Sequence, residues 1–295
     1  MTIIDDIKES YRRGTALNKL IYLNLGLFLA VQIVRIVLFL SNSYDHYDEF
    51  LRFLAIPSNL EVLARRPWTF VTYMFLHEGF LHILVNLLWL FWFGSIFIQE
   101  LGMKKLLSTY LLGGLAGGVF FVVFYNLFPV FEPVREMSIA LGASASVMAV
   151  VVAAAVYRPD RRLYLVLIGP VKVGYIALAM FILTSLVDFS VNAGGKIAHI
   201  GGALMGFVFA YYYKRGKDIS RGFDRLMDRI SSWFKPGRQK MKVTHKRPFT
   251  DFEYNKQKAD EQKMVDDILE KISKGGYDSL TSKEKELLFK MGKKN

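Results

Sequence analysis

The chain contains no cysteine among its 295 residues. Disulfide bonds, catalysis by a thiolate and metal sites built from cysteine are therefore excluded. Acidic residues are also scarce: 26 Asp and Glu stand against 38 Lys and Arg, which leaves a net charge of +12 at pH 7. Such a surplus of positive charge indicates an anionic partner, either a lipid surface or a nucleic acid.

The basic surplus is concentrated in one block, residues 214–247, which holds twelve Lys and Arg against three Asp, a net charge of +9. The residues after it, 248–295, hold ten basic and ten acidic side chains. Because the block follows the last long apolar run, it is typical of the cytoplasmic flank of a membrane protein, where it faces anionic lipid headgroups. Nucleic-acid binding is less favoured, since no aromatic and basic fold signature accompanies the charge.

Long apolar runs precede that block. The chain is 53% hydrophobic and its mean hydropathy is +0.27, which is too apolar for an ordinary soluble enzyme. A helix needs about 20 apolar residues to cross a bilayer core of ~30 Å. We therefore predict an all-α fold with six transmembrane helices, over residues 20–40, 81–101, 106–127, 140–157, 171–189 and 197–213. The first is too long for the apolar core of a signal peptide and is predicted to be retained.

Charges between the predicted spans indicate the orientation of the bundle. Basic residues gather at the N-terminus, in the tail and in two loops, those after the second and fourth spans (Lys104, Lys105, Arg158, Arg161 and Arg162). Such regions stay on the cytoplasmic side, so both termini are expected there. We predict a cytoplasmic N-terminus (1–19), a membrane domain (20–213), a basic segment with a linker (214–255) and a helical C-terminal unit (256–295).

Two parts of the tail have a readable pattern. Residues 217–234 are amphipathic and suit a helix on the membrane surface, and residues 239–255 are predicted to be a linker. Residues 260–291 are predicted to form a helical hairpin, broken at Gly275-Gly276 and restarted by a helix-start signal in SLTSKEKELLFKM.

Polar side chains inside a span are functional candidates, because hydrocarbon makes them costly. They form three clusters: HEGFLHILVN in the second span, GASAS in the fourth and AHIGGALMG in the sixth. All three spans start at the outer side, so His82, Asn86, Ser144 and His199 are expected at one depth, about one helical turn below the surface. His82 and Asn86 are four residues apart and share a helix face.

This set of residues suits acyl transfer. Ser144 is a nucleophile once a base takes its proton, and His199 can be that base. His82 and Asn86 can donate hydrogen bonds to the oxyanion of a tetrahedral intermediate. With no carboxylate at that depth in the fourth or sixth span, we expect a Ser–His dyad.

Other polar residues of these clusters have simpler interpretations. Ser146 is expected to be a packing residue, and His77 to lie in the loop before the second span. The sequence HExxxH spaces its histidines five apart, so His77 and His82 do not share a helix face and a zinc site is disfavoured. A transporter is also disfavoured, since paired broken helices with buried charges are missing from the pattern.

Four motifs in order resemble those of the rhomboid intramembrane serine proteases: HxxxN at His82–Asn86, FGxxxxxE ending at Glu100, GxS ending at Ser144, and AHxxGxxxG around His199. The resemblance covers residues 68–213 and is to the bacterial six-helix type. It implies cleavage of transmembrane proteins in a bacterial cytoplasmic membrane, by a Ser144–His199 dyad without a cofactor. It likewise implies that His82 and Asn86 bind the oxyanion.

Three positions depart from the resemblance. Ala145 stands where these proteins usually have glycine, Met148 where many have an aromatic residue, and Trp68-Thr69 where Trp-Arg is common. The extra methyl group of Ala145 could crowd the nucleophile. The alternative function is therefore a proteolytically inactive relative that binds membrane-protein clients.

Overall fold

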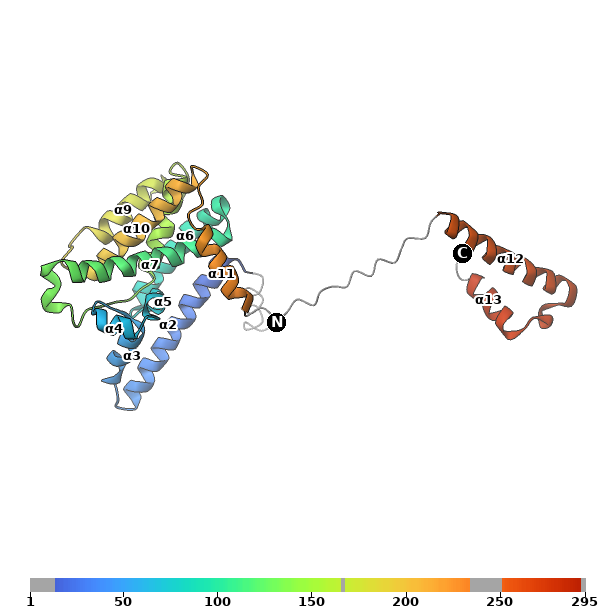
Figure 1. Cartoon of the computed structure of the whole chain (residues 1–295), viewed down its shortest axis with the longest axis horizontal. Helices are drawn as coiled ribbons and strands as arrows, with labels where there is room; N and C mark the ends of the chain where they lie inside the picture. Colours follow the sequence, from blue (N-terminus) through green and yellow to red (C-terminus); the bar gives the residue numbers. More distant parts are fainter. Residues whose placement is uncertain (1–13, 166–167, 234–250, 293–295) are drawn as a thin grey trace. The chain divides into compact units, whose positions relative to one another are not determined.

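The structure is a computed structural model that describes residues 14–165, 168–233 and 251–292. The chain divides into two compact units, Met1–Phe234 and Lys235–Asn295, and helices dominate both (Figure 1). Most of the predicted N-terminal segment and part of the basic block lie outside the described residues.

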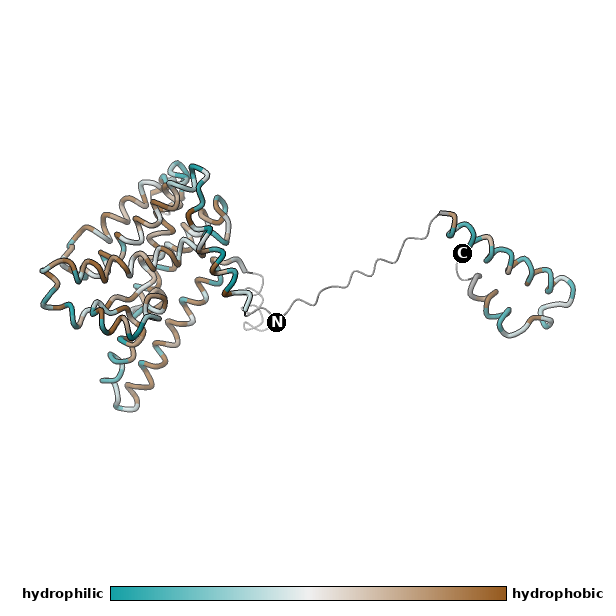
Figure 2. The backbone as a smooth tube through the Cα atoms, viewed as in Figure 1, coloured by the Kyte–Doolittle hydropathy of each residue, from teal (hydrophilic) through white to brown (hydrophobic). Residues whose placement is uncertain are grey.

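Six apolar helices make up most of the first unit, in the order that the sequence predicts and near the predicted positions. The third begins at residue 103, so Lys104 and Lys105 lie in its first turn and not in a loop as predicted. The six helices are α2 (Ala16–Leu40), α6 (Phe80–Leu101), α7 (Met103–Leu127), α8 (Ser144–Tyr157), α9 (Val173–Ser185) and α10 (Ala193–Tyr213). Of these, α2, α6, α7 and α10 are long and apolar enough to cross a membrane, whereas α8 and α9 are shorter. Figure 2 shows hydrophobic residues along these helices and hydrophilic ones along most of the second unit. The predicted helical membrane bundle is confirmed.

Helix α8 lies at the centre of the bundle, in contact with α6, α7, α9 and α10. Nearly all of its residues are buried, and it is apolar on every side, as a fully packed helix must be. Small residues make this packing close, because they let helix backbones approach one another. Four glycines of α7 (Gly113, Gly114, Gly117 and Gly118) are buried for the same reason.

The connection from α2 to α6 explains where α8 begins. It contains α3 (His46–Leu54), β1 (Ile56–Pro57), α4 (Leu60–Arg65), α5 (Thr69–Thr72) and the 3-10 helix η1 (Tyr73–Phe75). Strand β1 pairs antiparallel with β2 (Ile139–Ala140), which follows the 3-10 helix η2 (Pro129–Val134). This pairing keeps the chain extended, so the fourth helix starts at Ser144 and not at residue 140 as predicted.

The last two predicted spans also differ at their ends. A hairpin of β3 (Arg162–Leu165) and β4 (Gly169–Lys172) takes up the first residues assigned to the fifth span. Helix α9 therefore runs only from Val173 to Ser185, shorter than the predicted 171–189. Helix α10 starts at Ala193, four residues before the predicted 197, because Asn192 caps it by accepting a hydrogen bond from the Gly195 N–H at 3.2 Å.

A further helix, α11 (Arg221–Trp233), occupies most of the predicted amphipathic segment. It docks on the start of α7 through polar contacts. The Lys105 ammonium lies 2.5 Å from a carboxylate oxygen of Asp218 and 2.5 Å from one of Asp224, and the Ser108 hydroxyl donates to Asp224. The amphipathic helix is thus tied to the bundle by ion pairs.

The second unit contains α12 (Asp251–Gly275), the 3-10 helix η3 (Tyr277–Ser279) and α13 (Ser282–Gly292). Helix α12 begins inside the stretch 239–255 that is predicted to be a linker, most of which lies outside the described residues. Gly276 has a φ of +73°, which ends α12 at the predicted glycine pair. Thr281 and Glu284 form a reciprocal capping box, so the predicted helix start is confirmed.

Candidate active site

Ser144 is the first residue of α8, and its position follows from the chain just before it. Gly142 has a φ of +131°, a backbone conformation that favours glycine, and its N–H donates to the Tyr73 carbonyl at 2.9 Å. This turn joins β2 to α8 and leaves Ser144 half-buried. Ala143, at the cap position, offers no side-chain acceptor to the first N–H groups of α8, which also have no partner within the helix.

His82 lies directly beside that turn. A Cβ atom placed on Gly142 would be 3.1 Å from Cε1 of His82 and 3.5 Å from Oγ of Ser144. The imidazole of His82 and the hydroxyl of Ser144 therefore flank the same glycine, although the two residues come from α6 and α8. A glycine is needed here both for its backbone angle and for this space.

His199 is held from α9, not by a carboxylate. Its Nδ1 lies 3.1 Å from the carbonyl oxygen of Thr184. Because a carbonyl oxygen can only accept a hydrogen bond, Nδ1 must bear the proton, and the lone pair is left on Nε2. Among the described residues, His199 and Ser144 share no hydrogen bond, and catalytic bonds of this kind commonly tighten when substrate binds.

Two glycines of α10 bring this helix against the start of α8. A Cβ atom on Gly202 would collide with the backbone of Ala145, and one on Gly206 with the backbone of Ala149. The helices therefore meet backbone to backbone within one turn of both Ser144 and His199. The structure places the two residues at the same end of the contact between α8 and α10.

Asn86 is buried and points towards His77. Its amide Nδ2 donates to the His82 carbonyl at 2.9 Å and lies 3.5 Å from Nε2 of His77. The rings of His77 and His82 also meet edge to face, 5.1 Å apart. Asn86 therefore has one firm hydrogen bond and one long contact that an oxyanion could replace.

His77 is a site residue whose role the sequence did not predict. It lies in the predicted loop, between η1 and α6, but its side chain is almost fully buried. Burial lowers the pKa of His77 to about 4, so this ring is neutral at pH 7. The only sequence signal for its place beside Asn86 is that it precedes Asn86 by nine residues.

Ser146 faces a different environment from Ser144. Its side chain is fully buried and its hydroxyl packs on Gly114 and Met74. Among the described residues this hydroxyl has no hydrogen-bond partner. The described residues also contain no group of three or more His, Asp or Glu side chains that could hold a metal ion.

At the other end of α6, Glu100 of the predicted FGxxxxxE motif binds the loop after α8. One of its carboxylate oxygens lies 3.2 Å from Nε of Arg158 and the other 3.3 Å from Nη1 of Arg161. This motif residue is thus an anchor for the basic loop and lies apart from Ser144.

Comparison with known proteins identifies the fold. The family model of the Rhomboid domain matches residues 64–216, which is more than half of the chain. The chain belongs to the rhomboid family. Within its second unit, residues 250–294 match a family of unknown function, DUF6576.

Several rhomboid proteins align with the chain. RHOMBOID-like protein 12, mitochondrial, of Arabidopsis thaliana is 29% identical over 52% of this chain and 48% of that protein. Rhomboid protease GlpG of Pectobacterium atrosepticum is 33% identical over 31% of this chain and 33% of that protein. Rhomboid protein 1, mitochondrial, of Saccharomyces cerevisiae is 24% identical over 54% and 45%. The chain spans about half the length, or less, of these relatives.

Proposed function

We propose that this rhomboid is an intramembrane serine endopeptidase that cleaves transmembrane proteins in or near their membrane helices. The observation that supports this most is the bond from Nδ1 of His199 to the Thr184 carbonyl, which leaves Nε2 as a proton acceptor on a helix packed against the start of α8. One relative is named a protease, Rhomboid protease GlpG, and this supports the same activity.

The reaction would begin with Ser144. Its Oγ attacks the scissile carbonyl carbon while Nε2 of His199 takes the hydroxyl proton. The resulting imidazolium keeps its Nδ1–H on the Thr184 carbonyl and then protonates the leaving amine. Water next attacks the acyl-enzyme with His199 again as base, which releases the second product and restores Ser144.

The oxyanion formed in each step would be stabilised from three sources. His82 lies beside Gly142 and Ser144, and Asn86 can exchange its long contact with His77 for the oxyanion. The first N–H groups of α8 provide further donors at the positive end of a helix dipole. A substrate helix must unwind to present its carbonyl here, because a helical backbone hydrogen-bonds its own carbonyl groups.

The assignment is tested by cleavage of a purified single-span substrate in detergent or liposomes. Ser144→Ala and His199→Ala should abolish cleavage, whereas Ser146→Ala, in the same helix turn, should retain it. Asn86→Ala should slow cleavage by about 10²–10³-fold, the usual effect of losing one oxyanion donor. Undiminished cleavage by both single variants, Ser144→Ala and His199→Ala, would refute the dyad.

The alternative is a non-proteolytic protein that binds membrane-protein clients. A serine-reactive fluorophosphonate probe distinguishes it from the protease. Labelling of the wild type that disappears in Ser144→Ala supports the enzyme. Absence of labelling in a folded wild-type sample, judged by its thermal unfolding transition, supports the client-binding protein.

The proposed setting is a bacterial cytoplasmic membrane with both termini in the cytoplasm. The basic loops and tail would then face anionic headgroups, and the end of the bundle with Ser144 would face outward. Cofactors play no part in this proposal, and neither does nucleic acid.

A further inference from the structure

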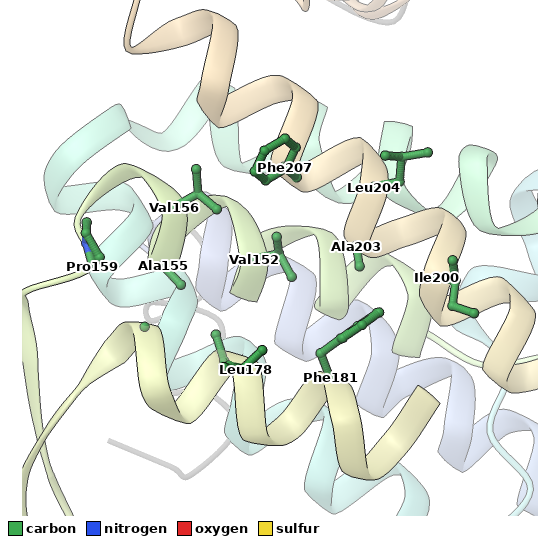
Figure 3. Close-up of a pocket in the computed structure, with 12 residues that line it drawn as sticks. Val152, Ala155, Val156, Pro159, Leu178, Phe181, Ile200, Ala203, Leu204 and Phe207 are labelled. Carbon is green, nitrogen blue, oxygen red and sulfur yellow. The ribbon is translucent and has the colours of Figure 1, made fainter. Parts of the chain in front are cut away.

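A groove lies beside the second half of α8, and on α10 it extends from Ile200 to Phe207. It has a volume of about 490 Å³ and its twelve lining residues, from α8, α9, α10 and the loop after α8, are all apolar. Figure 3 shows Val152 and Val156 of α8 between Leu178 of α9 on one side and Phe207 of α10 on the other. None of the four candidate active-site residues lines it.

The groove opens towards the surroundings of the bundle. Leu178, Leu204 and Phe207 line it and are 57%, 47% and 46% exposed. In a membrane-spanning chain such side chains face hydrocarbon, so the natural occupant of the groove is an acyl chain, since water does not fill an apolar cavity.

A basic pocket adjoins the groove at the ends of α8 and α10. It has a volume of about 610 Å³ and is lined by Tyr157, Arg158, Pro159, Asp160, Arg161, Arg162 and Lys214. Pro159 lines both cavities. An apolar groove therefore leads into a pocket that contains four cationic side chains and one carboxylate.

Two of these cations are free to bind an anion. Arg158 and Arg161 pair with Glu100, but within the described part of the chain Arg162 and Lys214 have no carboxylate partner. Lys214 Nζ donates instead to the carbonyl of Val156 at 3.2 Å. Because Val156 lines the groove, this bond holds the ammonium group at the groove's rim.

We propose that the groove and the basic pocket form a binding site for one anionic phospholipid. An acyl chain lies between α8, α9 and α10, and the phosphate binds beside Arg162 and Lys214. Basic pockets between helices on the cytoplasmic side are suited to such headgroups. The proposal does not depend on protease activity, because none of the four candidate active-site residues lines the groove or the basic pocket.

The test is native mass spectrometry of the full chain in detergent with added lipid. Phosphatidylglycerol and phosphatidylcholine of the same acyl chains are compared as probes. We expect the wild type to retain one phosphatidylglycerol in preference to phosphatidylcholine. Arg162→Gln with Lys214→Gln should weaken phosphatidylglycerol binding roughly 10- to 30-fold and remove the preference.

Matched variants separate the two halves of the site. Leu178→Trp fills the groove from an exposed position and should weaken the binding of both lipids, whereas Leu183→Trp, exposed on the same helix but outside the groove, should not. Arg221→Gln with Arg225→Gln removes two charges from α11 and should preserve the preference for phosphatidylglycerol.

Three results would overturn the proposal. They are equal binding of the two lipids by the wild type, an unchanged preference in the Arg162 and Lys214 double variant, and unchanged lipid binding by Leu178→Trp. Displacement of the bound phosphatidylglycerol by a single-span helical peptide would instead assign the groove to a protein helix.

Discussion

Ala145 follows the candidate nucleophile, and its methyl group has a defined place in the packing. It is almost fully buried and faces Gly117 of α7, where a side chain at position 117 would collide with it. The methyl group therefore fills the space between α7 and α8, and the residue that departs from the family pattern is accommodated by a glycine on the neighbouring helix.

Ala145→Gly tests this interpretation. The variant loses a buried methyl group and gains backbone freedom in the first turn of α8, so we expect the free energy of unfolding to fall by roughly 1–2 kcal/mol. The rate of substrate cleavage should change by less than about threefold. Thermal or denaturant unfolding in detergent and a cleavage assay measure the two effects.

A large gain in cleavage would contradict that expectation. An increase of tenfold or more in Ala145→Gly would mean that the methyl group crowds Ser144 and that its packing against Gly117 is incidental. Ala149→Gly, buried one turn later, is the control for a general loss of packing in α8.

The sequence predicts the polar residues of the candidate site better than the groups that orient their side chains. Ser144, His199, His82 and Asn86 are identifiable because polar side chains are rare in apolar spans. The carbonyl that orients His199 belongs to Thr184, and a backbone group leaves no trace in a residue pattern. The burial of His77 beside Asn86 was not predicted for another reason, since burial of a loop histidine depends on tertiary packing.

Helix ends are where the elements depart from the predicted spans. The predicted spans include residues 140–143 and 171–172, but strand pairing of residues 140 and 171–172 and the turn at Gly142 keep these residues out of the helices. The pairing of β1 with β2 depends on contacts distant in sequence, and the local hairpin of β3 and β4 takes the residues before α9, so apolar patterns alone overestimate α8 and α9. Ser144 is therefore the first residue of α8 and not an interior residue. It lies beside the first backbone N–H groups of this helix, which have no partner within the helix.

The attachment of α11 is an element-scale property with its own test. Lys105 is only 13% exposed and pairs with Asp224, whose side chain is 8% exposed. Burial alone would raise the pKa of Asp218, but hydrogen bonds from Lys105 and Ser220 bring it below the ordinary value. The ion pair between Lys105 and Asp218 therefore persists to lower pH than the ordinary pKa of a carboxyl would allow, and it holds the segment just before α11 on α7.

Lys105→Met should release α11. The change leaves a buried carboxylate without its cation, which costs roughly 3–5 kcal/mol where such a pair is broken. Amide hydrogen exchange of α11, followed by mass spectrometry, should become fast. Lys104→Met removes a charge from the exposed pair with Asp228 and should change exchange little. Slow exchange retained in Lys105→Met would show that apolar contacts hold α11.

At the scale of the whole molecule, the sequence predicts the number and order of the apolar helices. It could not predict the central place of α8, because that depends on glycines of α7 and α10 that allow close approach. The second unit was predicted as a hairpin from its glycine break and capping residues, which are local signals. The orientation of the bundle in the membrane remains a prediction from loop charges.

That orientation can be measured directly, because a chain without cysteine accepts single cysteine probes. Glu49→Cys, Asp160→Cys and Asp278→Cys each replace an exposed acidic residue, the first in α3, the second after α8 and the third in η3. In intact cells a membrane-impermeant maleimide should label only Glu49→Cys. Permeabilised cells should show labelling of all three, which controls for reactivity. Labelling of Asp160→Cys in intact cells would contradict the predicted orientation, because it would place the basic loop with Arg158, Arg161 and Arg162 outside the cell. The lipid site proposed beside this loop would then face the outer leaflet.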